Sequence, residues 1–132
     1  MGLYAVLPAI AAAGFLLAMA LIALRPEAPA ARASWMVPAI LCLMFAAWSG
    51  YAVATEGPAG FWPVHTANAW GNQVWFDLLL AAGVASFCLA PGAKQAGMRV
   101  RLWLLLVVMT GSIGLLAMLS RYLYLREKGT VT

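Results

Sequence analysis

Four long apolar stretches alternate with short polar segments along the chain. Each stretch has about 18 to 23 residues, which as a helix is enough to cross a hydrocarbon core of about 30 Å. The four predicted helices cover approximately residues 3–24, 36–53, 70–89 and 102–124. The pattern therefore predicts an all-α fold, a four-helix transmembrane bundle with short loops.

The composition agrees with this pattern. Hydrophobic residues make up 65% of the 132 positions and charged residues 9%, far below the roughly 25% of soluble domains. Four spans leave only about 40 residues outside the membrane, so we expect one transmembrane domain over residues 1–132 and no separate soluble domain. Any chemistry then has to lie within the bundle or its connections.

The basic residues are distributed unevenly between the predicted loops. The net charge is +4, but Lys and Arg stand singly or in small groups at the ends of spans, which is typical of membrane flanks and not of nucleic-acid binding. Five of the eight lie in loops one and three, and none in loop two: Arg25, Arg32, Lys94, Arg99 and Arg101. We therefore predict that loops one and three are cytoplasmic and both termini external. The basic residues of the last 12 positions disagree, since this topology leaves Arg121, Arg126 and Lys128 outside.

Asp77 is the only acidic side chain inside a predicted span. An ionised carboxylate in the hydrocarbon costs several kcal/mol unless a partner or water receives it, so Asp77 is a candidate functional site. It lies roughly 10 Å below the start of its helix, and Arg121 lies on the order of 8 Å from the end of the fourth helix, on the same side of the membrane. One interpretation is a structural ion pair with Arg121, with Asn72 and Gln73 completing the hydrogen bonds. The other is a proton-handling or ion-handling site, or a polar anchor for a lipophilic ligand in a cavity lined by Trp75.

His65 and the two cysteines are the remaining candidates for ligand chemistry. His65, the only histidine, lies in the second loop without a second histidine, a cysteine pair or a carboxylate cluster at metal-ligand spacing. It is either a ligand of a metal or pigment, or an interfacial polar residue. Cys42 and Cys88 lie in apolar runs and are expected to be free. GxSxG, HExxH and Walker-type motifs are absent, so we predict no metal site and no catalytic residue.

Three local motifs within residues 35–127 resemble a known family. They are Asn68 followed nine residues later by Asp77 in an aromatic-rich helix start (Trp75-Phe-Asp-Leu-Leu79), the Gly97-Met-Arg99 turn before Trp103, and the terminal Tyr122-Leu-Tyr-Leu-Arg126-Glu127. With these motifs the chain resembles the DUF2834 family of small bacterial integral membrane proteins, for which no activity is established.

The resemblance implies a three-helix unit, to which this chain adds an amino-terminal helix, in the inner membrane of a bacterium. It also implies that four residues matter to the fold or to a site: Asn68, Asp77, Arg126 and Glu127. The chain differs from the family in the third loop, where Ala93-Lys94-Gln95 stands in place of an expected acidic residue.

The leading functional hypothesis is a non-enzymatic integral membrane protein that serves as an accessory or interaction subunit of a larger membrane complex. No cofactor is predicted, although the seam between helices could hold a lipid or a pigment. The expected partners are membrane lipids and either other membrane subunits or further copies as a homo-oligomer, with no nucleic acid. The alternative is a small oligomeric transporter that uses Asp77 as its coupling or binding carboxylate. A third hypothesis is a membrane enzyme acting on a lipophilic isoprenoid or lipid, with Asp77 as the acid and His65 assisting.

Overall fold

The structure, a computed structural model, describes residues 2–24 and 32–129. Every regular element within these residues is helical, which confirms the predicted all-α class. The chain forms two compact units, Met1–Ala31 and Arg32–Thr132. That the whole chain is one domain stays a prediction. Arg25, which contributed to the predicted topology, lies outside the described residues.

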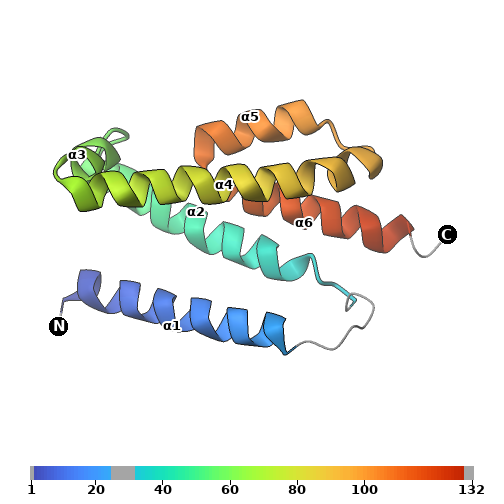
Figure 1. The fold of residues 1–132 in the computed structure, drawn as a ribbon, viewed down its shortest axis with the longest axis horizontal. Helices are drawn as coiled ribbons and strands as arrows, with labels where there is room; N and C mark the ends of the chain where they lie inside the picture. Colours follow the sequence, from blue (N-terminus) through green and yellow to red (C-terminus); the bar gives the residue numbers. More distant parts are fainter. Residues whose placement is uncertain (1, 25–31, 130–132) are drawn as a thin grey trace. The chain divides into compact units, whose positions relative to one another are not determined.

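The first unit contains one apolar helix, α1 (Leu3–Ala23), drawn in blue in Figure 1. It carries no charged side chain, and large apolar side chains such as Ile10, Phe15 and Leu21 are exposed on it. A helix that is apolar all round belongs in a larger core or in a membrane. Its bounds agree with the helix predicted over residues 3–24, which is confirmed.

Two helices of the second unit, α2 (Met36–Glu56) and α4 (Ala69–Gln95), are also long and apolar enough to cross a membrane. With α1 they make three candidate spans among the described residues, which indicates an integral membrane protein. Both helices run beyond their predicted ends, and α4 continues through Pro91. A proline removes one backbone hydrogen bond, and membrane helices tolerate the loss where neighbouring groups support the freed backbone.

The helix expected over residues 102–124 is not formed as one piece, because the chain breaks at Gly111. α5 (Val100–Thr110) and α6 (Ser112–Gly129) meet there at a φ of 60° and a ψ of −124°, a conformation that glycine adopts without a Cβ clash. α6 then folds back along α5, so closely that a Cβ on Gly114 would lie 2.7 Å from the carbonyl carbon of Leu106. The four-helix bundle of the prediction is therefore corrected to three long helices and an α5–α6 hairpin (Figure 1).

Side-chain donors satisfy backbone carbonyls near the tip of the α5–α6 hairpin. The hydroxyl of Thr110 donates to the carbonyl of Leu106 at 2.7 Å, and the thiol of Cys42, on α2, donates to the carbonyl of Ile113 at 3.4 Å. Lipid offers no hydrogen bonds, so non-helical backbone at membrane depth occurs where protein surrounds it. α6 packs against α2 on one side of the tip, whereas Val108 and Met109, just before Gly111, are exposed.

The buried core of the second unit lies where α4, α5 and α6 meet. Ala93 on α4, Met98 in the following turn and Met118 on α6 are buried against one another. Gly92 allows this approach, because a Cβ there would lie 2.7 Å from the hydroxyl oxygen of Tyr122 on α6. The last turns of α4 are therefore level with the second half of α6.

The end of α6 lies beside the start of α2. Both carboxylate oxygens of Glu127 accept from the backbone N–H of Ala33, at 2.9 and 3.0 Å, and the hydroxyl of Ser120 donates to the carbonyl of Trp35 at 2.9 Å. The prediction that the carboxyl terminus lies opposite loops one and three thus needs correction. Because the hairpin reverses the chain, α6 ends at the same end of this unit as the α4–α5 turn and the start of α2.

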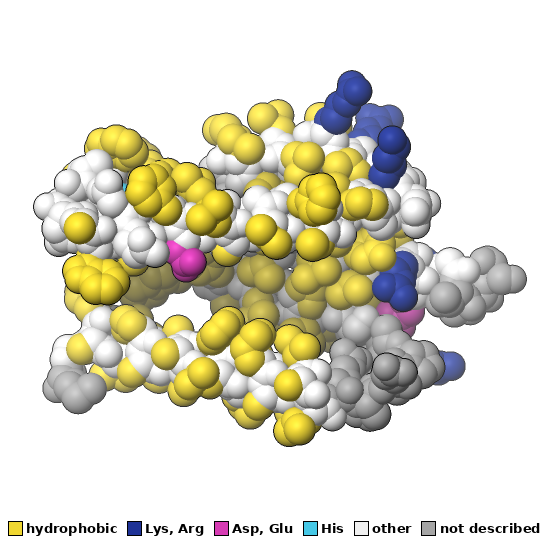
Figure 2. Space-filling model, in the orientation of Figure 1, with side chains coloured by type: hydrophobic (Ala, Val, Ile, Leu, Met, Phe, Trp, Pro, Cys, Tyr) yellow, Lys and Arg dark blue, Asp and Glu magenta, His cyan; other side chains and the backbone are white. Residues whose placement is uncertain are grey.

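The basic side chains of the second unit gather at this end, which we call the basic end (Figure 2). Arg32 precedes α2; Lys94, Arg99 and Arg101 lie around the α4–α5 turn; Arg121, Arg126 and Lys128 lie in the last turns of α6. The opposite end is formed by α3 (Phe61–Thr66) and the start of α4. It carries Glu56 and, just over two turns into α4, Asp77, but no Lys or Arg among the described residues.

Candidate functional site

Asp77 lies on the outer surface of a candidate span. It is eight residues beyond the first residue of α4, about 12 Å along the helix axis. Its side chain is exposed and makes no hydrogen bond or ion pair with the residues that the structure describes. The exposed apolar side chains of Val74, Leu80 and Val84 share this face of α4, because they are three, three and seven positions away. We call these four residues the Asp77 face.

The structure does not bring Asp77 and Arg121 together. Arg121 precedes Tyr122, which contacts Gly92 near the end of α4. Asp77 is fifteen residues before Gly92 on the same helix, about 22 Å along the axis. The expected pairing assumed that the last helix crosses the membrane in one piece, whereas the hairpin returns Arg121 to the basic end.

Arg121 instead lies over an aromatic ring. Its guanidinium is 5.6 Å from the ring centroid of Tyr124, and the ammonium of Lys128 is 4.8 Å from the same centroid. Cation–π contacts of this kind stabilise by about 0.5–1 kcal/mol at exposed sites. The two residues Arg121 and Tyr124 also line a groove of about 450 Å³ between α2 and α6, together with Trp35, Ala39, Cys42, Leu43, Ala117 and Ser120.

Four of the other predicted site residues belong to the joint between α3 and α4. Asn68 caps α4 by accepting the N–H of Gly71 at 2.9 Å, and the side-chain amide of Asn72 donates to the carbonyl of His65 at 2.7 Å. Nδ1 of His65 lies 3.3 Å from the carbonyl oxygen of Gly71 and donates to it, since a carbonyl can only accept. Asn72 is therefore engaged with α3 and not with Asp77.

Trp75, the fourth of these residues, belongs to an aromatic cluster. Its ring centroid lies 5.7 Å from that of Phe61, in a stacked arrangement, and 4.9 Å from that of His65. Such pairs contribute about 0.5–1.5 kcal/mol beyond the area they bury. Trp75 lines neither the α2–α6 groove nor a second groove between α4 and α5, and Gln73 is exposed without a hydrogen bond to the described residues.

We expect the cap at Asn68 to contribute measurably to stability. Asn68→Ala should lower the free energy of unfolding by about 1 kcal/mol, because it leaves an N–H of the first turn of α4 without its acceptor. Denaturation of the purified protein in mixed micelles measures this change. Asn68→Asp, which keeps the acceptor, and Gln73→Ala, on an exposed neighbour, should stay within about 0.5 kcal/mol of the parent. Equal losses in all three variants would contradict the capping role.

Metal-binding clusters are not found in the described part of the chain. No group of three or more His, Cys, Asp or Glu side chains is close enough there to hold an ion. Cys42 and Cys88 are both free thiols. His65, with one ring nitrogen directed to Gly71, serves the α3–α4 joint.

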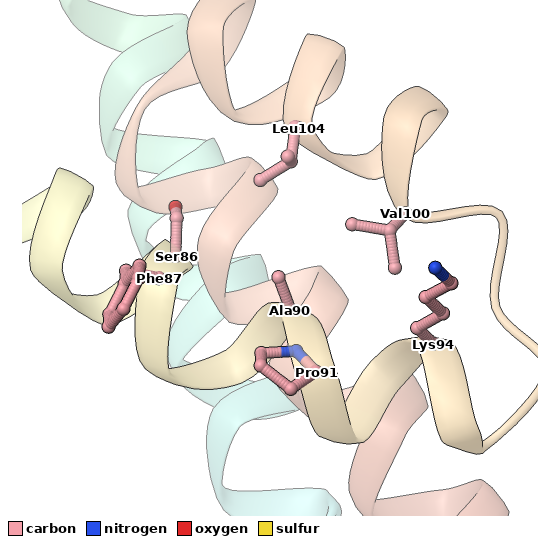
Figure 3. Close-up of a pocket in the computed structure, with 7 residues that line it drawn as sticks. All are labelled: Ser86, Phe87, Ala90, Pro91, Lys94, Val100 and Leu104. Atoms are coloured by element: carbon pink, nitrogen blue, oxygen red, sulfur yellow. The ribbon is translucent and has the colours of Figure 1, made fainter.

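The groove between α4 and α5 opens near the basic end. Its volume is about 500 Å³, and it is lined by Ser86, Phe87, Ala90, Pro91, Lys94, Val100 and Leu104 (Figure 3). Only Ser86 and Lys94 of these carry polar side chains. The sequence pattern indicated Lys94 as a charged loop residue, because the third helix was expected to end before Pro91. It indicated none of the other residues that line the groove. No local pattern predicts which side of α4 the next helix covers.

No protein-family model, curated protein or solved structure matches this chain. The class of protein is therefore defined by the helices themselves: an all-helical membrane protein with three helices long enough to cross a bilayer among its described residues. The resemblance to the DUF2834 family stays a prediction, and so do the roles that it implies. In the structure, three of its four residues make contacts: Asn68 caps a helix, the guanidinium of Arg126 lies 5.8 Å from the ring centroid of Tyr122, and Glu127 accepts from the backbone of Ala33.

Proposed function

We propose that this chain is a non-enzymatic interaction subunit of a larger assembly in a bacterial inner membrane, and that the Asp77 face is its contact surface. The observation that carries the proposal is a carboxylate exposed on a candidate span and unpaired among the described residues. In hydrocarbon such a group requires a cation, a hydrogen-bond donor or a water-filled cavity. A partner helix that supplies a donor would satisfy this requirement.

The charges of this chain favour a foreign partner over a second parallel copy. The described Lys and Arg residues of the second unit lie at the basic end, and the nearest on the same helix, Lys94, is seventeen residues from Asp77. Parallel copies would place the same ends side by side, so none of these residues would reach Asp77. A complementary cation is therefore expected on another polypeptide.

We further propose a topology of three spans and a re-entrant α5–α6 hairpin, with the amino terminus external and the carboxyl terminus cytoplasmic. If the basic end is cytoplasmic, loop one, the α4–α5 turn and the end of α6 carry all eight Lys and Arg residues on one side. This distribution follows the positive-inside rule without exception. The proposal assigns no catalytic reaction and no cofactor to the chain.

Removing the charge of Asp77 tests the interaction. The tagged protein is extracted from its own membranes in mild detergent, and native mass spectrometry records the polypeptides that remain bound. A foreign chain should be present in fixed ratio, and Asp77→Asn should reduce its occupancy at least tenfold, because truncating one member of a buried charge pair costs about 2–5 kcal/mol.

Glu56→Gln is the matched control, since Glu56 ends α2 outside the apolar part of the span. It should leave the partner bound. A partner that is retained equally by Asp77→Asn would contradict the proposed contact surface. A homo-oligomer without foreign chains, and with solute flux in liposomes that Asp77→Asn abolishes, would support the transporter in its place.

A further inference from the structure

We propose that the α4–α5 groove binds one acidic glycerophospholipid, with an acyl chain along the groove and the phosphate at Lys94. The inference rests on the proposed insertion in the membrane and does not depend on a partner at the Asp77 face. The occupant follows from three observations: the shape of the groove, its lining, and the charge around its mouth.

The groove has the dimensions of a lipid chain. Its volume of about 500 Å³ lies in the range of small-molecule sites, about 300–1,000 Å³. From Lys94 to Ser86 it follows eight residues of α4, about 12 Å. A segment of one acyl chain fits this length and volume.

The lining separates an apolar floor from a charged mouth. Ala90 and Leu104 line the wall between the two helices, and Phe87, 81% exposed, stands at the side (Figure 3). Lys94 lies at one end, near Val100 and the α4–α5 turn. A ligand that fills this site therefore has an apolar tail and an anionic group at the end next to Lys94.

The positive charge at the mouth has no carboxylate near it in the sequence. Arg99 and Arg101 flank Val100, which lines the groove, and no Asp or Glu occurs between Asp77 and Glu127. Lys94 is exposed and forms no ion pair with the described residues. Basic residues at the surface of a membrane attract acidic lipids, by about fivefold for each Lys or Arg. The phosphate of an acidic phospholipid supplies the missing negative charge at headgroup level.

The test is lipid selection by the purified full chain. The protein is reconstituted in nanodiscs of phosphatidylglycerol and phosphatidylcholine with the same acyl chains in equal amounts, and native mass spectrometry counts the lipids of each class that stay bound. We expect one phosphatidylglycerol to be retained in preference. Lys94→Gln should reduce this preference about fivefold, and Ala90→Phe, which fills the groove, should remove the retained lipid.

Lys128→Gln is the matched control, because it removes a lysine charge from the basic end without touching the groove. It should lower the preference much less than Lys94→Gln does. Equal retention of the two lipids, an equal loss in Lys94→Gln and Lys128→Gln, or a lipid that persists in Ala90→Phe would overturn the proposal. The proposal would also be overturned if a second copy or a foreign helix bound to the protein and Ala90→Phe abolished that binding while the lipid stayed bound. Asp77→Asn should keep the lipid, so the failure of the subunit proposal and the failure of this one are distinguishable.

Discussion

Cysteines introduced at Gln95 and at Gly129 are expected to react with a membrane-impermeant reagent from the same side of the membrane. Gln95 ends α4 and Gly129 ends α6. The α5–α6 hairpin returns the chain to the basic end, where α6 packs on α4 through Tyr122 and Gly92. The measurement is labelling of oriented vesicles and of vesicles opened with detergent, in a background where Cys42→Ser and Cys88→Ala remove the native thiols.

Ala59→Cys provides the opposite side as a control, since Ala59 lies between α2 and α3. It should be labelled only from the other face of the vesicle. If Gly129→Cys is labelled together with Ala59→Cys, residues 100–129 form one continuous span and the hairpin is excluded. The two arrangements predict that Gly129→Cys is labelled from opposite sides of the membrane, so the experiment distinguishes them without comparing amounts of labelling.

Gly114→Ala should destabilise the protein by about 3 kcal/mol, near the upper end of the usual cost of overpacking. The added Cβ would lie 2.7 Å from three backbone atoms of α5, the carbonyl carbon and oxygen of Leu106 and the nitrogen of Val107. Backbone atoms of a helix cannot rotate away as a side chain can, so α5 and α6 must separate. Denaturation in mixed micelles gives the free energy of unfolding.

Gly83→Ala is the matched control for this substitution. Gly83 also lies inside an apolar helix, but a Cβ at this position would meet no atom within 4 Å. Its unfolding free energy should rise slightly or stay the same, because alanine favours helix over glycine by about 1 kcal/mol. If both substitutions lower the free energy of unfolding by similar amounts, Gly114 is not required for the close crossing of α5 and α6.

The three long helices could be predicted from apolar length alone. Their apolar runs are bounded by charged or turn-forming residues, and the predicted starts at residues 3, 36 and 70 fall within one residue of those observed. The ends were less predictable. α4 runs through Pro91 to Gln95 because its last turns pack on α6, and this tertiary support is invisible in a local pattern.

The hairpin was missed because its break is a single glycine within an unbroken apolar run. Glycine is common in packed membrane helices, so neither residue stands out in the sequence. Only the fold shows that Gly111 has a positive φ and that Gly114 lies where α5 and α6 cross closely. One signal was present. Arg121, Arg126 and Lys128 disagreed with the predicted topology, and the topology proposed above, in which the chain reverses at Gly111, removes the disagreement.

Part of the candidate site could be derived from the sequence. Asp77 was found because an acidic residue inside a span is unusual whatever the fold. Its partner could not be found, because the choice of Arg121 depended on the direction of the last helix. His65, Asn72 and Trp75 are close in the chain to Asp77, but hydrogen bonds and ring contacts hold them in the α3–α4 joint.

The shortness of α5 imposes an order on assembly in the membrane. Its 11 residues extend about 16 Å, roughly half of the hydrocarbon thickness, so α5 cannot enter the bilayer as an independent span. The hairpin packs on α2, where the thiol of Cys42 donates to the carbonyl of Ile113, and on the surface around Ala93 of α4. In the proposed topology, we therefore expect α2 and α4 to insert before α5 and α6 pack against them.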